Sequence, residues 1–115
     1  MSAWADAGFA LRTLRQLPVH RLGEHRQHWS VLDVRSPQEW ARGHVPGARH
    51  VFLPELPHAL GTLDRNAPVA VYCDSGYRAS LGASLLQARG FEAASVPGSW
   101  QAWKAQRMPV QTPSG

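Results

Sequence analysis

The sequence predicts an α/β protein whose sheet is parallel and is flanked by helices on both faces. Two short apolar runs rich in β-branched residues, SVLDV (30–34) and PVAVYC (68–73), have the composition of strands buried on both faces. Helical signals follow each run, and this alternation of strands and helices is typical of parallel sheets. The chain has 115 residues, 43% of them apolar, which suits one compact domain.

A short helix should follow the first strand. Ser36, Pro37 and Glu39 form a capping-box pattern with proline at the first helical position, and Gly43 is a stop signal. The sequence therefore predicts a helix of about two turns at this point.

A longer helix should follow the second strand, over residues 79–90. An apolar face is offered by Leu81, Leu85, Leu86 and Ala88. The small residues that should let the helix lie close to the sheet are Ala79, Gly82 and Ala83. The segment AASV (93–96) is then expected to be a further strand, and residues 99–106 a closing helix with two tryptophans.

Cysteine usage and charge limit the functional classes. A single cysteine cannot form an internal disulfide, and the sequence has neither a signal-peptide pattern nor an apolar run of about 18 residues. These features predict a cytoplasmic protein without a membrane partner. The formal charge is +4, but the basic residues are scattered singly along the chain, so no nucleic-acid partner is expected.

The single cysteine stands at the end of the most apolar predicted strand. Ligands collect at the carboxyl ends of the strands in open parallel sheets, so Cys73 occupies a position expected for a functional site. The turn that follows consists of Asp74, Ser75, Gly76, Tyr77 and Arg78. Its amides and the positive end of the next helix can point at the sulfur and favour a thiolate or a small anion.

Two residues of this turn strengthen that interpretation. Gly76 allows backbone angles that other residues avoid, and Arg78 adds a permanent positive charge at the rim. The alternative is that Cys73 is an ordinary small residue of the core. We favour the site because the alternative leaves the glycine, the arginine and the helix start unexplained.

Three ordered motifs have a spacing found in one known family. The segment VLDVRSPQEWARGHVPGARHV (31–51) contains Asp-x-Arg, a short helix and Gly-His-x-Pro-Gly-Ala. The segment VYCDSGYRAS (71–80) contains Cys-x-x-Gly-x-Arg, and PGSWQAW (97–103) is similar to a closing Gly-Gly-x-x-Ala-Trp. With these motifs the sequence resembles a rhodanese-type domain, the family of single-cysteine sulfurtransferases, over nearly the whole chain.

The resemblance implies a rhodanese-like fold with about five parallel strands and a double-displacement reaction. Cys73 would take the outer sulfur of thiosulfate or of a low-molecular-weight persulfide, and a thiol or cyanide would then remove it. The loop from Asp74 to Arg78 would hold the anionic sulfur. Neither a metal nor an organic cofactor is implied, and the expected partners are a small sulfur donor and a thiol acceptor.

Two features depart from the family pattern. Members that favour thiosulfate often carry a basic residue beside the cysteine, whereas Asp74 would repel a dianion, so a persulfide donor is at least as well supported. In the closing motif, Pro97 and Gly98 stand where two glycines are usual, which affects the expected backbone geometry there more than the chemistry.

Two other functions compete with sulfur transfer. Cysteine phosphatases and arsenate reductases use a similar loop with five residues between cysteine and arginine, whereas this chain has four, which suits one sulfur atom better than a phosphate. A protein-interaction or sulfur-relay module of a larger protein could keep the fold without independent catalysis. Retention of Cys73, Gly76 and Arg78 favours the enzyme.

Several further residues are candidates for supporting roles. Asp33 and Arg35, at the end of the neighbouring strand, could bond loop amides or pair with Arg78 and Glu39, or they could anchor the helix after Ser36. Tyr77, at the loop tip, could contact substrate. The six histidines include one close pair, His25 and His28, and no metal site is expected. His44 should be structural.

The first residues form an expected N-terminal extension, 1–14, ahead of a rhodanese-like domain over 15–115. SAWADAGFALRT (2–13) can be aligned with QAWKAQRMPVQT (101–112), so that Trp4 meets Trp103. The extension therefore resembles the tail of a preceding domain, which in this family can be another rhodanese domain or a metallo-β-lactamase-type domain. A plain N-terminal amphipathic helix explains it equally well.

Overall fold

The structure is a computed structural model that describes residues 16–25, 27–64 and 66–112. The expected extension over residues 1–14 lies outside the described residues. None of the described helices is long and apolar enough to cross a membrane.

Within the described residues, four parallel strands form the sheet, in the order β2-β1-β3-β4. They are β1 (Ser30–Asp33), β2 (Arg49–His50), β3 (Val69–Tyr72) and β4 (Ala93–Ser95). The expectation was about five strands. At the outer edge of β4, Gln16 forms an isolated parallel bridge with Ser95, and the Leu17 amide donates to the Ser95 carbonyl at 2.9 Å, so one bridge extends the sheet there.

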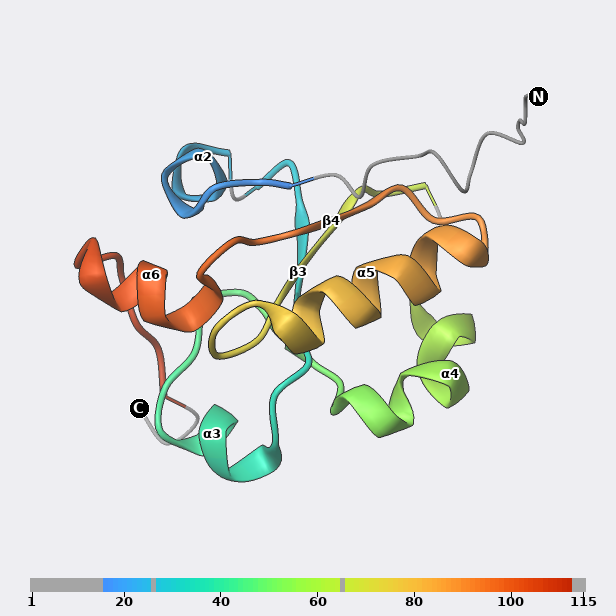
Figure 1. Cartoon of the computed structure of the whole chain (residues 1–115), viewed down its shortest axis with the longest axis horizontal. Helices are drawn as coiled ribbons and strands as arrows, with labels where there is room; N and C mark the ends of the chain where they lie inside the picture. The colour runs from blue at the N-terminus through green and yellow to red at the C-terminus, as the bar shows by residue number, and fades with distance from the viewer. Residues whose placement is uncertain (1–15, 26, 65, 113–115) are drawn as a thin grey trace.

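Helices cover both faces of this sheet. The α-helices are α2 (Val19–Glu24), α3 (Pro37–Ala41), α4 (Leu56–Ala59), α5 (Tyr77–Ala88) and α6 (Ser99–Ala105), and two short 3₁₀ turns flank α4, η1 (Leu53–Glu55) and η2 (Leu60–Thr62). Figure 1 shows α4 and α5 on one side of the strands and α2 and α6 on the other. The predicted doubly covered α/β sheet is confirmed.

The core is divided into two clusters because successive residues of a strand point to opposite faces. Val69 and Val71 of β3 pack in the cluster beneath α4 and α5, and the Cys73 side chain belongs to the same cluster. Ala70 and Tyr72 pack in the cluster beneath α2 and α6. A strand buried on both faces explains why its sequence is a continuous apolar run.

The short helix α3 begins as its sequence predicts. The Glu39 amide donates to Ser36 Oγ at 3.3 Å, and the Ser36 amide donates to Glu39 Oε1 at 2.9 Å, which completes the capping box. The chain leaves the helix at Gly43, whose φ of +140° favours glycine. Glu39 is thereby fixed near the start of α3, close to the carboxyl edge of the sheet.

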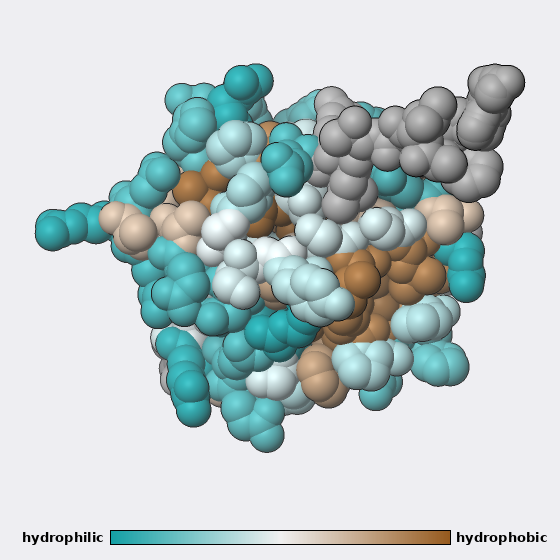
Figure 2. Space-filling model, viewed as in Figure 1, coloured by the Kyte–Doolittle hydropathy of each residue, from teal (hydrophilic) through white to brown (hydrophobic). Residues whose placement is uncertain are grey.

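The long helix α5 uses its small residues, rather than its leucines, for most of its contact with the sheet. Ala79, Gly82, Ala83 and Leu86 are buried, and a Cβ on Gly82 would lie 3.2 Å from a Val71 methyl group. The prediction that Leu81 and Ala88 belong to the buried face is wrong, because Leu81 is 47% exposed and Ala88 is exposed as well. In Figure 2 an apolar area lies over the part of the surface that α4 and α5 form.

Candidate active site

Cys73 directly follows β3, at the carboxyl edge of the sheet, and is 1% exposed. The Gly76 amide donates to Cys73 Sγ at 3.0 Å. Gly76 has a φ of +122° and caps the N-terminus of α5, so the glycine is what lets the chain turn back over the sulfur. Among the described residues, Gly76 supplies the one loop amide that bonds Sγ in this geometry.

The start of α6 holds the loop from its other side. The Trp100 amide donates to the Cys73 carbonyl, and the Gln101 amide donates to the Asp74 carbonyl, both at 2.9 Å. The Gln101 side chain also donates to the Asp74 carboxylate at 2.9 Å. The loop is therefore bonded to a segment more than twenty residues later in the chain, which sequence reasoning did not identify as part of the site.

Ser99 contacts both the backbone amide and the sulfur of Cys73. Its hydroxyl accepts the Cys73 amide at 3.1 Å, donates to the Val96 carbonyl at 2.7 Å and lies 3.9 Å from Cys73 Sγ. Because Ser99 is buried, the Cys73 amide and the Val96 carbonyl satisfy its hydroxyl in place of water.

Arg78 is bound to Glu39 of α3. Its two terminal nitrogens donate to the two carboxylate oxygens at 2.8 and 3.0 Å, and the side chains are 32% and 26% exposed. The hydrogen bonds with Arg78 are the main cause that lowers the pKa of Glu39 from 4.5 to about 2, and the same bonds raise the pKa of Arg78. The cation at the loop rim is thus largely neutralised by its partner.

Asp33 and Arg35 pair with each other, and neither takes Arg78 or Glu39 as its partner. Arg35 donates from its amide and its side chain to the Asp33 carboxylate at 2.8–3.1 Å, and both side chains are buried. Arg35 also donates to the Gly43 carbonyl at 2.6 Å, so the pair ties the end of β1 to the end of α3. Burial lowers the pKa of Arg35, but the bonds and charge of Asp33 outweigh it and raise the pKa overall.

A cleft of about 420 Å³ opens beside the loop. The lining residues come from the segment after β1, from α3 and its C-terminal end, from the loop, from α6 and from the C-terminal segment. They are Arg35, Glu39, Arg42, Asp74, Trp100, Gln101, Lys104 and Val110. Arg42 and Lys104 are exposed, and within the described ranges neither forms an ion pair. The cleft is therefore lined by the Asp74 carboxylate and by two cations, Arg42 and Lys104, that are available to a ligand.

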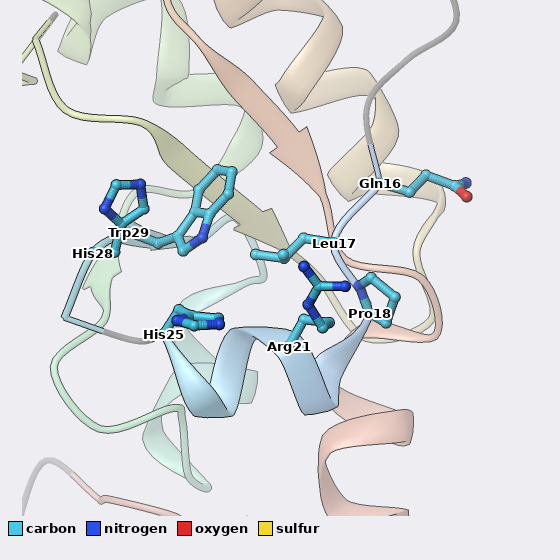
Figure 3. Close-up of a pocket in the computed structure, with 7 residues that line it drawn as sticks. All are labelled: Gln16, Leu17, Pro18, Arg21, His25, His28 and Trp29. Carbon is cyan, nitrogen blue, oxygen red and sulfur yellow. The ribbon is translucent and has the colours of Figure 1, made fainter.

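A second cavity, of about 310 Å³, lies beside α2 and away from the cysteine loop. Figure 3 shows side chains of α2 and of its C-terminal end facing Leu17 and Trp29 across it. His25 and His28 both line this cavity. The part of the chain that the structure describes contains no group of three His, Cys, Asp or Glu side chains arranged for a metal.

Comparison with known proteins agrees with the motifs and the fold. Residues 19–106 match the family model of the rhodanese-like domain. The chain belongs to this family. A thiosulfate sulfurtransferase, GlpE, of Pseudomonas putida is 35% identical over 86 residues, which cover 74% of this chain and 77% of that protein. A putative sulfurtransferase, YtwF, of Bacillus subtilis is 32% identical over 79 residues, covering 69% and 77%.

Solved structures of rhodanese-like proteins share the fold. A rhodanese-related protein of Thermoplasma volcanium superposes with a TM-score of 0.82 at 29% identity, covering 84% of this chain and 97% of that one. A rhodanese-like domain protein of Staphylococcus aureus superposes with a TM-score of 0.75 at 25% identity, covering 78% and 91%.

The closing motif of this rhodanese-like domain is one residue later than the sequence interpretation placed it. Counting back from Ala102 and Trp103, the two glycine positions of Gly-Gly-x-x-Ala-Trp fall on Gly98 and Ser99. The backbone agrees, because Gly98 has a φ of +69° and Ser99 a φ of +48°. The assignment of Pro97 to the first position was wrong, and the motif spacing was the signal that could have identified Ser99.

Two other sequence candidates lie at the edges of the site. The Tyr77 side chain is 75% exposed at the first position of α5, so substrate contact stays a prediction. His44 is buried, stacks on the Trp40 ring with 3.5 Å between ring centroids, and pairs through Nδ1 with the Val45 carbonyl at 3.1 Å. These contacts suit the structural role expected for His44.

Proposed function

We propose that this protein is a sulfurtransferase that carries sulfane sulfur on Cys73. The observation that supports this most directly is the Gly76 amide, 3.0 Å from Cys73 Sγ in a loop at the carboxyl edge of the sheet. A donor that points at the sulfur stabilises it as an anion, both as the attacking thiolate and as the persulfide. The relatives named as sulfurtransferases support the same reaction class.

The proposed reaction has two displacements. The Cys73 thiolate attacks the outer sulfur of the donor, the new S–S bond forms on Cys73, and the bond inside the donor breaks to release sulfite from thiosulfate or a thiolate from an organic persulfide. An acceptor thiolate then attacks the outer sulfur of the Cys73 persulfide and restores the Cys73 thiolate. No net redox change is required, and the sole proton change is the ionisation of the thiols.

The cleft beside the loop supports an organic persulfide with carboxylate groups as one donor. Asp74 places a negative charge at the loop mouth, where the small dianion thiosulfate has to approach. Arg42 and Lys104 place positive charges on the lining of the same cleft, where a carboxylate of a larger donor can bind. The names of the GlpE relatives support thiosulfate, so both donors belong in the proposal.

Intact-mass measurement tests the proposal. The protein is incubated with thiosulfate and, separately, with glutathione persulfide, before and after a thiol acceptor is added. We expect the mass of one sulfur atom to appear and then to disappear with the acceptor. Cys73→Ser, which keeps a side chain of similar volume, should stay unmodified and folded.

The opposite result would favour the second candidate, a sulfur-relay or docking module of a larger protein. Folded and reduced wild-type protein that gains no sulfur from either donor would overturn independent transferase activity. A cytoplasmic location, expected from the single cysteine, stays a prediction of this proposal.

A further inference from the structure

Ser99 combines a glycine-like backbone with a buried hydroxyl beside the reactive sulfur. Its φ of +48° lies in the left-handed region, which only Arg107 shares among the described residues other than glycine. A side chain in this conformation is strained relative to glycine. The strain is borne at a buried residue in contact with Cys73, which is where functional strain is commonly found.

The contacts of the hydroxyl leave its proton free to change partner. Ser99 Oγ donates to the Val96 carbonyl at 2.7 Å in the structure, but the Ser99 amide also donates to that carbonyl, at 3.0 Å. Rotation of the O–H bond toward Cys73 Sγ, 3.9 Å away, therefore leaves the Val96 carbonyl with a partner. The Cys73 amide, which bonds a lone pair of Oγ at 3.1 Å, keeps its acceptor through the rotation.

We propose that Ser99 is a positioning residue for Cys73 whose hydroxyl turns from the Val96 carbonyl to the sulfur when the sulfur becomes an anion. The Gly76 amide then holds the sulfur from the loop and Ser99 holds it from the start of α6. The O–H bond donates and no covalent bond changes. The role toward the persulfide rests on the proposed sulfur transfer, whereas the role toward the thiolate does not depend on it.

Two substitutions separate this role from a merely structural one. Ser99→Gly removes the hydroxyl and also relieves the strained φ, while Ser99→Ala removes the hydroxyl and keeps the strain. Stability should therefore differ between the two, with Ser99→Gly unfolding at the higher denaturant concentration. The change in thiolate formation at Cys73 should be the same in both variants, because both lack the O–H donor.

The ultraviolet absorbance of the thiolate, followed against pH, is the direct measurement, with Cys73→Ser as the blank. We expect both Ser99 variants to form the thiolate at a pH about half to one unit higher than the wild type. Ser95→Ala is the matched control, since Ser95 is equally buried but belongs to β4, and its titration should follow the wild type.

A titration unchanged in both Ser99 variants would overturn the proposal, and so would a shift in Ser99→Ala alone, because that shift would follow the strain. This measurement uses no sulfur donor. Its failure is therefore distinguishable from the failure of the transferase function, which the persulfide adduct reports.

Discussion

Two arginine–carboxylate pairs lie at the carboxyl edge of the sheet, and they differ in burial and in sequence separation. Asp33 and Arg35 are two residues apart and 0% and 2% exposed, whereas Glu39 and Arg78 are 39 residues apart and about one quarter to one third exposed. Their shortest N–O distances are the same, 2.8 Å. The same shortest distance therefore occurs in a buried pair that follows β1 and in a partly exposed pair that joins α3 to the loop.

The buried pair is held by more than charge. The guanidinium carbon of Arg35 lies 4.6 Å from the Trp100 ring centroid and 5.5 Å from the Tyr72 ring centroid. Two aromatic rings therefore contact the guanidinium group. Tyr72 in turn accepts the Val45 amide on its hydroxyl at 3.0 Å, and burial is the main cause that raises its pKa. The partly exposed pair of Glu39 and Arg78 joins α3 to the loop.

Removing Arg35 should produce the largest effect on stability. In Arg35→Met the Asp33 carboxylate stays buried without its cation, and loss of one partner of a buried pair costs about 3–5 kcal/mol. Urea unfolding measures the loss, and a second variant with Asp33→Asn added should recover part of it. A loss below about 1 kcal/mol in Arg35→Met would show that Asp33 finds water or another partner.

Glu39→Gln should have a smaller effect that depends on pH. Because Arg78 lowers the folded-state pKa of Glu39 from 4.5 to about 2, the pair's contribution is fully present above about pH 4.5 and is lost as pH falls toward 2. Solvent screening of this partly exposed pair reduces the expected loss at neutral pH to about 1–2 kcal/mol. Glutamine can still accept the Ser36 amide, so the helix cap is kept.

The difference in unfolding free energy between wild type and Glu39→Gln, measured from pH 7 to pH 2.5, checks this prediction. The two curves should converge as Glu39 becomes protonated, since the neutral acid and the amide then resemble each other. A difference independent of pH would mean that the loss comes from packing and not from the charge of Glu39.

Local signals explain which parts of this site could be predicted from the sequence. The cap of α3, the turn at Gly76 and the place of Cys73 after a doubly buried strand each depend on a few consecutive residues. The partner of Arg78 could not be chosen in the same way, because Glu39 reaches it through the packing of α3 against the loop.

The role of Ser99 was missed for a related reason. Pro97 and Gly98 have the composition of a turn, and for that reason the motif was placed one residue too early. The spacing back from Trp103 places the two glycine positions on Gly98 and Ser99. Leu81 was assigned to the buried face as part of an apolar helix face with Leu85, Leu86 and Ala88, but its side chain is exposed. The structure uses Ala79, Gly82 and Ala83 instead, because the close approach of α5 to β3 leaves little room for larger side chains.

The smallest expected effect concerns the cations that lack an ion pair within the described part of the chain, Arg42 and Lys104. Unlike the two paired arginines, they keep their charge available for a ligand, so Arg42→Gln with Lys104→Gln should leave stability nearly unchanged. Exposed charges each contribute up to about 1 kcal/mol, so kcat/KM for glutathione persulfide should fall about 3- to 10-fold.

The persulfide of a neutral thiol should be nearly unaffected by the same double variant, and Arg21→Gln, beside the other cavity, is the matched control. Added salt should reduce the wild-type preference for the carboxylate-bearing donor, because it screens exposed charges. Equal losses with both persulfides would remove the cleft from donor recognition. Selectivity would then rest on the loop itself, where Asp74 is bonded to Gln101 and Arg78 is already paired with Glu39.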